Sequence, residues 1–352
     1  MDKTTRFLNA CRRAPVDCTP VWFMRQAGRY QKEYRALRER HSIIDLCKTP
    51  DLAAQVTLLP VDQMDLDAAI IFGDLMLPLE GIGVRYELRE NVGPIIEQPI
   101  RTEEQVRALR PFEARRDVPY LLEALGIVRR ELGGRVPLIG FAGAPFTLAA
   151  YMIEGKGSRD YRHTKIFMFS RPDLWRSLMD HLVGTIVNYL GGQVEAGAQT
   201  VQIFDSWIGC LSPADYREYV LPHMKKLFAG LAGLGVPVIH FGTGTATLLT
   251  LMAEAGGDVI GADWRIGLGE AWGLIGPGRA IQGNLDPVVL FADFETIKRR
   301  SAEILRAAAG RSGHIFNLGH GILPGTPVDS VRRLADFVHE ASAALASGRA
   351  IP

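Results

Sequence analysis

The chain has 352 residues, of which 47% are hydrophobic and 22% are charged, and its net charge is +1. This composition is typical of a soluble globular protein, and the balanced charge excludes a global field that would favour nucleic acid or an anionic membrane surface. No apolar run reaches the roughly 18 residues needed to span a bilayer, and the N-terminus lacks the apolar segment of a signal peptide. Because none of the four cysteines forms a CxxC pair, we expect reduced thiols and a cytoplasmic protein.

Eight short apolar runs recur along the chain, and longer segments with helical periodicity separate them. The runs are continuously apolar rather than alternating, as expected of parallel strands that are covered on both faces. They comprise residues 21–24, 68–72, 136–141, 200–204, 237–241, 258–261, 280–282 and 314–318. The segments between them predict helices over residues 173–195, 213–234, 294–309 and 328–345, with Pro172, Pro213 and Pro327 at or just inside helix starts and Thr326 as an N-cap.

Eight βα units favour an α/β fold of the (β/α)8 TIM-barrel type, in a single domain over residues 1–352. A doubly wound open sheet is the main competitor, because periodicity alone does not distinguish the two. A barrel needs about 250 residues, and most of the others fall in an N-terminal helical extension and between Asp74 and Arg135. Within the second region, residues 83–100 alternate in polarity and contain a turn at residues 91–94, which predicts a β-hairpin insertion after the second strand.

The first apolar run breaks abruptly into Arg25-Gln26-Ala27-Gly28-Arg29. Arginine gives planar, bidentate recognition of carboxylate or phosphate, and a glycine lets the backbone approach a ligand closely. A strand that ends in such a cluster is better explained by an anionic ligand than by the needs of folding.

Polar residues also follow other strands, and the carboxyl ends of all strands meet on one face of a barrel, where active sites of this fold are built. Asp74 follows the second run, Ser206 the fourth and His320 the eighth, while Tyr151 lies on the helix after the third. Each has a structural alternative: Asp74 and Ser206 are also common turn or capping residues, Tyr151 fits a core position, and the arginines could pair with nearby acids.

The chain lacks the sequence motifs of several other enzyme classes. The chain has no GxSxG nucleophile elbow, no GxxxxGK[ST] phosphate loop and no HExxH zinc motif. The glycines of Gly242-Thr243-Gly244-Thr245 could cradle a phosphate, but without a nearby lysine a tight βα turn is favoured.

Two long motifs resemble those of the uroporphyrinogen decarboxylase family. The first is Pro20-x-Trp22-x-Met24-Arg25-Gln26-Ala27-Gly28-Arg29, and the second runs from Gly140-Phe141-Ala142-Gly143 through Pro145-Phe146-Thr147-Leu148 to Tyr151, Glu154 and Gly155. The resemblance covers nearly the whole chain. It implies a (β/α)8 barrel that forms a homodimer, works without metal or organic cofactor, and converts the four acetates of uroporphyrinogen III to methyls in heme biosynthesis, giving coproporphyrinogen III and CO2.

The same resemblance implies the site. Substrate contacts carry over to Arg25, Gln26, Ala27, Gly28, Arg29, Asp74, Tyr151, Ser206 and His320. Asp74 is the candidate catalytic carboxylate, facing the pyrrole ring as it becomes cationic, and Arg25 is the second candidate catalytic residue. The proton donor stays open between His320 and other groups.

Two alternative functions stay open. One is a corrinoid- or thiol-dependent methyltransferase of the same superfamily, which would need zinc ligands. His240 ends the fifth run without a cysteine two residues later, and the last cysteine is Cys210. The other is a non-catalytic tetrapyrrole-binding protein.

Overall fold

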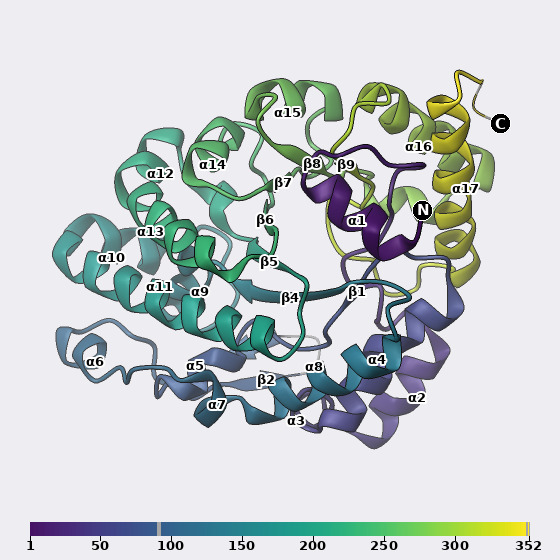
Figure 1. Cartoon of the computed structure of the whole chain (residues 1–352). Helices are drawn as coiled ribbons and strands as arrows, with labels where there is room; N and C mark the ends of the chain where they lie inside the picture. Colours follow the sequence, from purple (N-terminus) through teal and green to yellow (C-terminus); the bar gives the residue numbers. More distant parts are fainter. Residues whose placement is uncertain (90–92, 350, 352) are drawn as a thin grey trace.

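Seven parallel strands form the centre of the molecule, in the spatial order β1-β4-β5-β6-β7-β8-β9 (Figure 1). The computed structural model describes residues 1–89, 93–349 and 351. The strands are β1 (Ala69–Ile70), β4 (Leu138–Gly143), β5 (Thr200–Asp205), β6 (Val238–Gly242), β7 (Val259–Gly261), β8 (Ala280–Gln282) and β9 (His314–Ile315). Apart from β2 and β3, which form a separate hairpin, each strand pairs with the one that follows it in the chain. The strand order therefore never reverses, which excludes a doubly wound sheet and confirms the TIM-barrel type.

The predicted first strand, residues 21–24, is wrong as a regular strand, because only Val21 pairs, in a parallel bridge to Phe316. The carbonyl of Val21 also accepts the N–H of Asp67 at 2.8 Å, so Val21 lies between the last and first strands of the sheet. Beyond Val21, side-chain amides replace the backbone ladder: the N–H of Met24 donates to Asn317 Oδ1 at 3.1 Å.

The predicted N-terminal helical extension is present as α1 (Lys3–Cys11), which packs against one end of the barrel. Its buried Phe7, Ala10 and Cys11 share a cluster with barrel residues such as Trp22 and Ile139. In Figure 1, α1 lies beside β8 and β9. This helix fills one end of the barrel, and the carboxyl ends of the strands lie at the other.

The remaining helices surround the sheet. They are α2 (Lys32–Arg40), α3 (Ile43–Lys48), α4 (Pro50–Gln63), α5 (Leu77–Gly81), α6 (Glu103–Arg107), α7 (Ala114–Asp117), α8 (Pro119–Leu132), α9 (Pro145–Glu154), α10 (Arg162–Ser170), α11 (Pro172–Glu195), α12 (Pro213–Tyr219), α13 (Leu221–Leu231), α14 (Leu249–Ala255), α15 (Leu268–Ile275), α16 (Phe294–Ala308) and α17 (Val328–Ala346), with 3-10 turns at Ile208–Cys210, Ala232–Leu234 and Pro287–Phe291. Among the described helices, none is long and apolar enough to cross a membrane.

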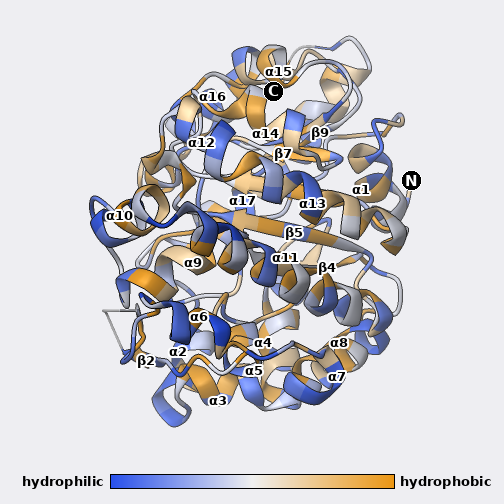
Figure 2. Ribbon diagram, turned by 90° about the vertical axis from the view of Figure 1, so that its left-hand side faces the viewer, coloured by the Kyte–Doolittle hydropathy of each residue, from blue (hydrophilic) through white to orange (hydrophobic). Residues whose placement is uncertain are grey.

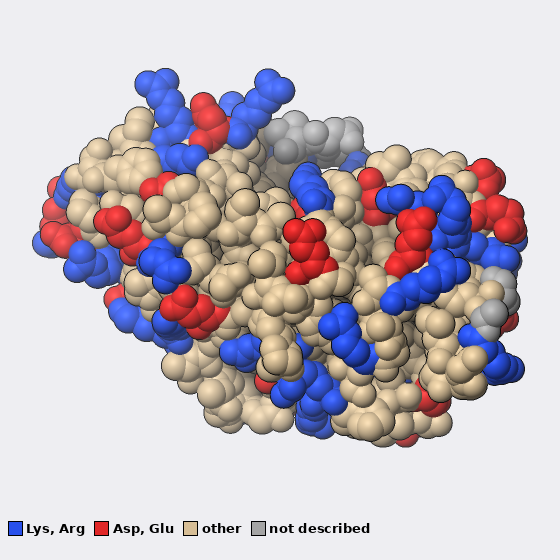
Figure 3. Space-filling model, turned by 90° about the horizontal axis from the view of Figure 1, so that it is seen from above, with Lys and Arg blue, Asp and Glu red and all other residues tan. Residues whose placement is uncertain are grey.

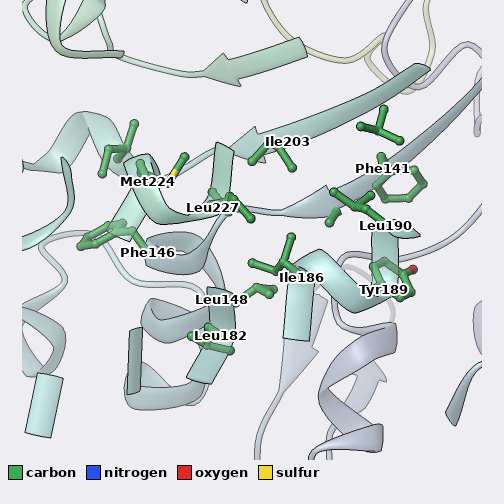
Figure 4. Packing of buried hydrophobic residues seen from close by; sticks show 14 of the residues in the cluster. Phe141, Phe146, Leu148, Leu182, Ile186, Tyr189, Leu190, Ile203, Met224 and Leu227 are labelled. Atoms are coloured by element: carbon green, nitrogen blue, oxygen red, sulfur yellow. The ribbon is translucent and has the colours of Figure 1, made fainter. Parts of the chain in front are cut away.

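The apolar residues of the long helix α11 explain why it packs in the helical layer around the strands. Figure 4 shows its Ile186 and Leu190 packed between the strands and the neighbouring helices, together with Ile203 of β5 and Leu227 of α13. In Figure 2 hydrophobic residues dominate the central strands, whereas the helices alternate hydrophobic and hydrophilic positions. Burying a large aliphatic side chain contributes roughly 1.5–3 kcal/mol, so this layer holds the strand ends in place.

Two predicted helix boundaries need correction. The predicted helix over residues 213–234 is broken at Val220, because Pro222 has no N–H to continue the helix from α12 into α13. Thr326 is not the N-cap of α17, since the helix begins at Val328 with Pro327 in the capping position, and the Thr326 hydroxyl donates to the carbonyl of Leu323 instead.

The hairpin insertion is confirmed, with β2 (Glu87–Arg89) antiparallel to β3 (Gly93–Ile95). Asn91 and Val92 of its predicted turn lie outside the described residues. All four cysteines are free, as expected. Figure 3 shows Lys and Arg interspersed with Asp and Glu on one face of the molecule, in agreement with the balanced net charge.

Candidate active site

Arg25 follows the barrel-closing residues and adopts a left-handed backbone conformation with φ of 59°. This is uncommon for a residue with a side chain and occurs mostly where the surrounding structure requires it. The side chain lies along the loop after β9: a Cβ added at Gly321 would be 2.4 Å from Arg25 Cδ. The fold thus brings together two segments from opposite ends of the chain, and the glycine makes that contact possible.

The guanidinium of Arg25 is exposed to solvent yet surrounded by protein atoms. This crowding lowers the pKa of Arg25, and Arg29 adds to the effect, while Tyr151 and Asp74 oppose it. Arg29, Asp74 and Tyr151 therefore lie close enough to Arg25 to act on it electrostatically, and Asp74 and Tyr151 also act on each other.

Asp74 lies between β1 and α5, and its Oδ1 accepts the N–H of Met76 at 2.9 Å. The carboxylate is half-buried. Burial raises its pKa, although the Met76 N–H and Arg25 oppose that rise. Asp74 is thus a carboxylate with little solvation of its own, which makes it responsive to any positive charge or N–H donor placed beside it.

Tyr151 projects from α9, the helix that begins at Pro145 directly after β4. Its ring lies against Trp207, with 3.7 Å between the ring centroids. Burial raises the pKa of Tyr151, so its hydroxyl stays protonated at neutral pH and can donate a hydrogen bond to an anion. The Trp207 indole packs against the Tyr151 ring at an interplanar angle of 38° and so restricts its movement.

His320 lies in the loop after β9, and its Nδ1 accepts the N–H of Gly321 at 2.7 Å. Burial, together with the nearby charges of Arg25 and Arg265, lowers the pKa of His320 to about 4, although Asp263 opposes the shift. The imidazole is therefore neutral at neutral pH, and its proton resides on Nε2. His320 is thus a neutral hydrogen-bond donor rather than an acid with the ordinary histidine pKa.

Ser206 follows β5 and is half-buried, and its carbonyl accepts the hydroxyl of Thr243. The preceding Asp205 is fully buried, with Oδ1 accepting from Thr147 Oγ1 at 2.9 Å and Oδ2 without a described partner. Burial raises the pKa of Asp205 to about 7. The sequence motifs do not single out Asp205, because only the fold shows that its carboxylate is fully buried.

The segment from Gln26 to Gly28 forms the turn between Arg25 and Arg29. The Gln26 side chain is buried, accepting the N–H of Phe23 and donating to the carbonyl of Ala68. Ala27 and Gly28 are half-buried, so a ligand could reach this turn. Gln26 therefore shapes the loop that carries both arginines.

The loop after β6 does not offer a phosphate cradle, since the N–H of Gly244 already donates to Asp263 Oδ2 at 2.5 Å. His240 of β6 is fully buried, and its ring centroid lies 5.1 Å from that of Phe228 on α13. It thus faces the helix layer. Across residues 1–89, 93–349 and 351, no group of three or more His, Cys, Asp or Glu is placed to hold a metal ion.

The chain is similar to known proteins over almost its whole length. The family model for uroporphyrinogen decarboxylase matches residues 2–341. A relative named uroporphyrinogen decarboxylase from Roseiflexus sp. (strain RS-1) is 55% identical over 344 residues, which cover 96% of this chain and 99% of the relative. This chain belongs to the uroporphyrinogen decarboxylase family. A second family member, from Carboxydothermus hydrogenoformans, is 53% identical over 336 residues, covering 96% of each chain.

Solved structures share the fold. A methyltransferase from Methanosarcina mazei superposes with a TM-score of 0.75 at 21% identity, covering 96% of this chain and 98% of that chain. A B12-independent methionine synthase from Shewanella sp. W3-18-1 gives a TM-score of 0.54 at 10% identity, covering 85% of this chain and 86% of that chain. The family therefore shares its barrel with methyl-transferring proteins, and the identity of this chain rests on its much closer sequence relatives.

Proposed function

We propose that this protein decarboxylates the four acetate side chains of uroporphyrinogen III, releasing four CO2 and giving coproporphyrinogen III for heme biosynthesis. The observation that carries the proposal is the half-buried Asp74 beside Arg25, in a chain that belongs to the uroporphyrinogen decarboxylase family. We further propose, from the family resemblance, that the protein acts as a homodimer.

The substrate supplies the electron sink. Protonation of the ring carbon next to the one that bears an acetate makes that pyrrole cationic. The C–C bond to the carboxylate then breaks, releasing CO2 and leaving its electron pair in a double bond between the ring and an exocyclic methylene. Protonation of the resulting methylene gives a methyl group, and loss of the proton first added to the ring restores the neutral pyrrole. In each cycle one carboxylate and one net proton become CO2 and a C–H bond.

Asp74 would stabilise the cationic ring. Its carboxylate accepts hydrogen bonds from pyrrole N–H groups and attracts the ring more strongly as positive charge develops. Burial strengthens this attraction, because little water competes for the carboxylate. Arg25 and Arg29 would bind substrate carboxylates, while Tyr151, Ser206 and neutral His320 would donate hydrogen bonds to others.

The acetate that is lost must be ionised, because only the carboxylate releases its electron pair to the ring as CO2 departs. A guanidinium beside that acetate favours its charged form, and the planar fork also fixes its direction. Arg25 is suited to this task because it lies close enough to Asp74 for the two charges to interact.

The first test is a direct assay with uroporphyrinogen III under reducing conditions, resolving products by their number of carboxylates. We expect hepta-, hexa-, penta- and tetracarboxylate products to appear in turn. A protein that binds the substrate without changing it would favour the non-catalytic alternative, and zinc-dependent methyl transfer would favour the methyltransferase.

The second test replaces Asp74 with Asn, which keeps the shape and removes the charge. Loss of one preorganised electrostatic group typically costs about 10²- to 10³-fold in rate, and we expect kcat for the first decarboxylation to fall by that much. Circular dichroism and substrate binding should show that the variant is folded. A kcat within a factor of about three of the wild type would contradict the role of Asp74.

A further inference from the structure

Arg265 follows β7 and lies at the same end of the barrel as His320. The loops that carry the two residues are in direct contact, since a Cβ added at Gly319 would be 2.4 Å from the backbone N of Trp264. Arg265 also acts electrostatically on His320, together with Arg25. Arg265 thus belongs to the group of strand-end residues, although neither the sequence motifs nor the family resemblance selects it.

The guanidinium of Arg265 is held in place by its own loop. Its Nη1 forms an ion pair with Oδ2 of Asp263, and its backbone N–H donates to Oδ1 of the same carboxylate at 3.0 Å. The guanidinium also lies over the Trp264 ring, 4.0 Å from the ring centroid. Asp263 is itself buried and accepts the N–H of Gly244. The cost of ordering this long side chain is therefore met before any ligand arrives.

This anchored guanidinium still has N–H donors that can bind a ligand. An arginine carries five N–H donors in a planar fork, and among the described residues Nε and Nη2 of Arg265 have no hydrogen-bond partner. Half of the side chain is exposed, at 50% relative accessibility. The open edge of the fork matches the two oxygens of a carboxylate.

The position of Arg265 indicates which carboxylate it would bind. Asp74, which would face the reacting ring, follows β1, whereas Arg265 follows β7, which is four places from β1 in the strand order around the barrel. Arg265 thus lies on the far side of the site from the chemistry. Carboxylates there belong to pyrrole rings other than the one that reacts, and of the two carboxylate types only the propionates survive all four decarboxylations.

We propose that Arg265 is a specificity residue that binds a propionate of the tetrapyrrole, through the guanidinium edge left open by Asp263 and Trp264. The inference rests on the proposed function. Because every pyrrole ring keeps its propionate in substrate, intermediates and product, Arg265 would bind a propionate of a ring that is not reacting in every round, without favouring the transition state over the ground state.

The test compares Arg265→Gln with the wild type in the first decarboxylation of uroporphyrinogen III. We expect KM to rise about 10- to 100-fold, as for loss of a charge-assisted carboxylate contact, with kcat within about threefold of the wild type. The inhibition constant of coproporphyrinogen III, whose only carboxylates are propionates, should rise by a similar factor. Arg265→Lys should recover part of both losses, since it keeps the charge but not the fork.

Arg333→Gln is the matched control. Arg333 has the same accessibility of 50%, pairs with Asp329, and lies 3.7 Å from the centroid of the Phe294 ring, in the groove between α16 and α17. We expect this variant to keep wild-type kinetics.

Three outcomes would overturn the proposal. The first is an unchanged KM in Arg265→Gln. The second is a raised KM with an unchanged inhibition constant for coproporphyrinogen III, which would mean that Arg265 binds an acetate. The third is a fall in kcat and Tm without a change in KM, which would mean that Arg265 has a structural role. A wild-type protein that leaves uroporphyrinogen unchanged would instead refute the proposed function, so the two failures are distinguishable.

Discussion

At the scale of single residues, the contact between Arg25 and Gly321 shows how a glycine can determine the position of a charged side chain. Replacing Gly321 with Ala would place a Cβ 2.4 Å from Arg25 Cδ and 2.6 Å from Cγ, so the guanidinium must move. A displacement of about 1 Å can cost about 10²-fold in rate, and we expect a loss of that order in kcat/KM for uroporphyrinogen.

Gly273→Ala provides the control for that substitution. Gly273 is exposed on α15, and a Cβ there meets nothing within 4 Å. We expect unchanged kinetics and a gain of up to about 1 kcal/mol in the free energy of unfolding, from the higher helix propensity of alanine. If Gly321→Ala kept wild-type kcat/KM, the loop after β9 would not position Arg25.

At the scale of elements, Asp205 joins the end of β5 to α9 through its hydrogen bond with Thr147. Burial raises its pKa from 3.8 to about 7, so between these values the folded state holds a proton that the unfolded state has lost. The contribution of Asp205 to stability therefore falls as pH rises through this range. Asp205→Asn removes the titration, and we expect its free energy of unfolding relative to the wild type to improve from pH 5 to pH 8 by at least about 1.4 kcal/mol, the equivalent of one pKa unit.

Urea unfolding at the two pH values measures this difference. Asp293→Asn is the control, because the N–H and hydroxyl of Thr296 lower the pKa of this exposed N-cap below 3.8, so its carboxylate is charged at both pH values. The stability of that variant relative to the wild type should not change between pH 5 and pH 8. An Asp205→Asn difference that does not change with pH would contradict the buried, protonated state of Asp205.

At the scale of the whole molecule, Asp67 connects both ends of the chain to the barrel. Its buried carboxylate accepts from Arg6 of α1 at 2.8 Å, from the backbone N–H of Val21 at 2.8 Å and from His339 of α17 at 2.6 Å. Although burial acts to lower the pKa of His339, the hydrogen bond to Asp67 and the charges of Asp67 and Asp65 raise it, which favours the charged imidazole.

We expect Asp67→Asn to lower the free energy of unfolding by about 3–5 kcal/mol, because it removes the buried carboxylate that Arg6 and His339 share and leaves them only the more exposed Asp17 and Asp65. Chemical denaturation measures the change. Arg299→Ala breaks an exposed pair with Glu303 within α16 and should cost no more than about 0.5 kcal/mol. A loss below 1 kcal/mol in Asp67→Asn would show that barrel closure does not depend on this carboxylate.

Local sequence determined much of this protein. Continuous apolar runs predicted the strands of the sheet, helical periodicity predicted α11 and α16 almost to the residue, and the motif from Pro20 to Arg29 identified the family. These features depend on neighbours within a few residues, where backbone geometry and side-chain spacing act directly. The break at Val220 and the cap of α17 were missed because proline geometry and a competing hydroxyl contact overrode the average pattern.

The environment of each site residue depends on the tertiary structure, because the contacts within the site join residues far apart in the chain. Val21 closes the barrel through Phe316 and Asp67, Arg25 lies along Gly321, and His320 is neutral because burial and two arginines lower its pKa. The residues that could bind a polycarboxylate, and the strands that they follow, can be predicted from the local sequence. Burial, charge state and the direction of each side chain were decided by the closed barrel, since solvent exclusion and electrostatic coupling exist only after distant strand ends are brought together.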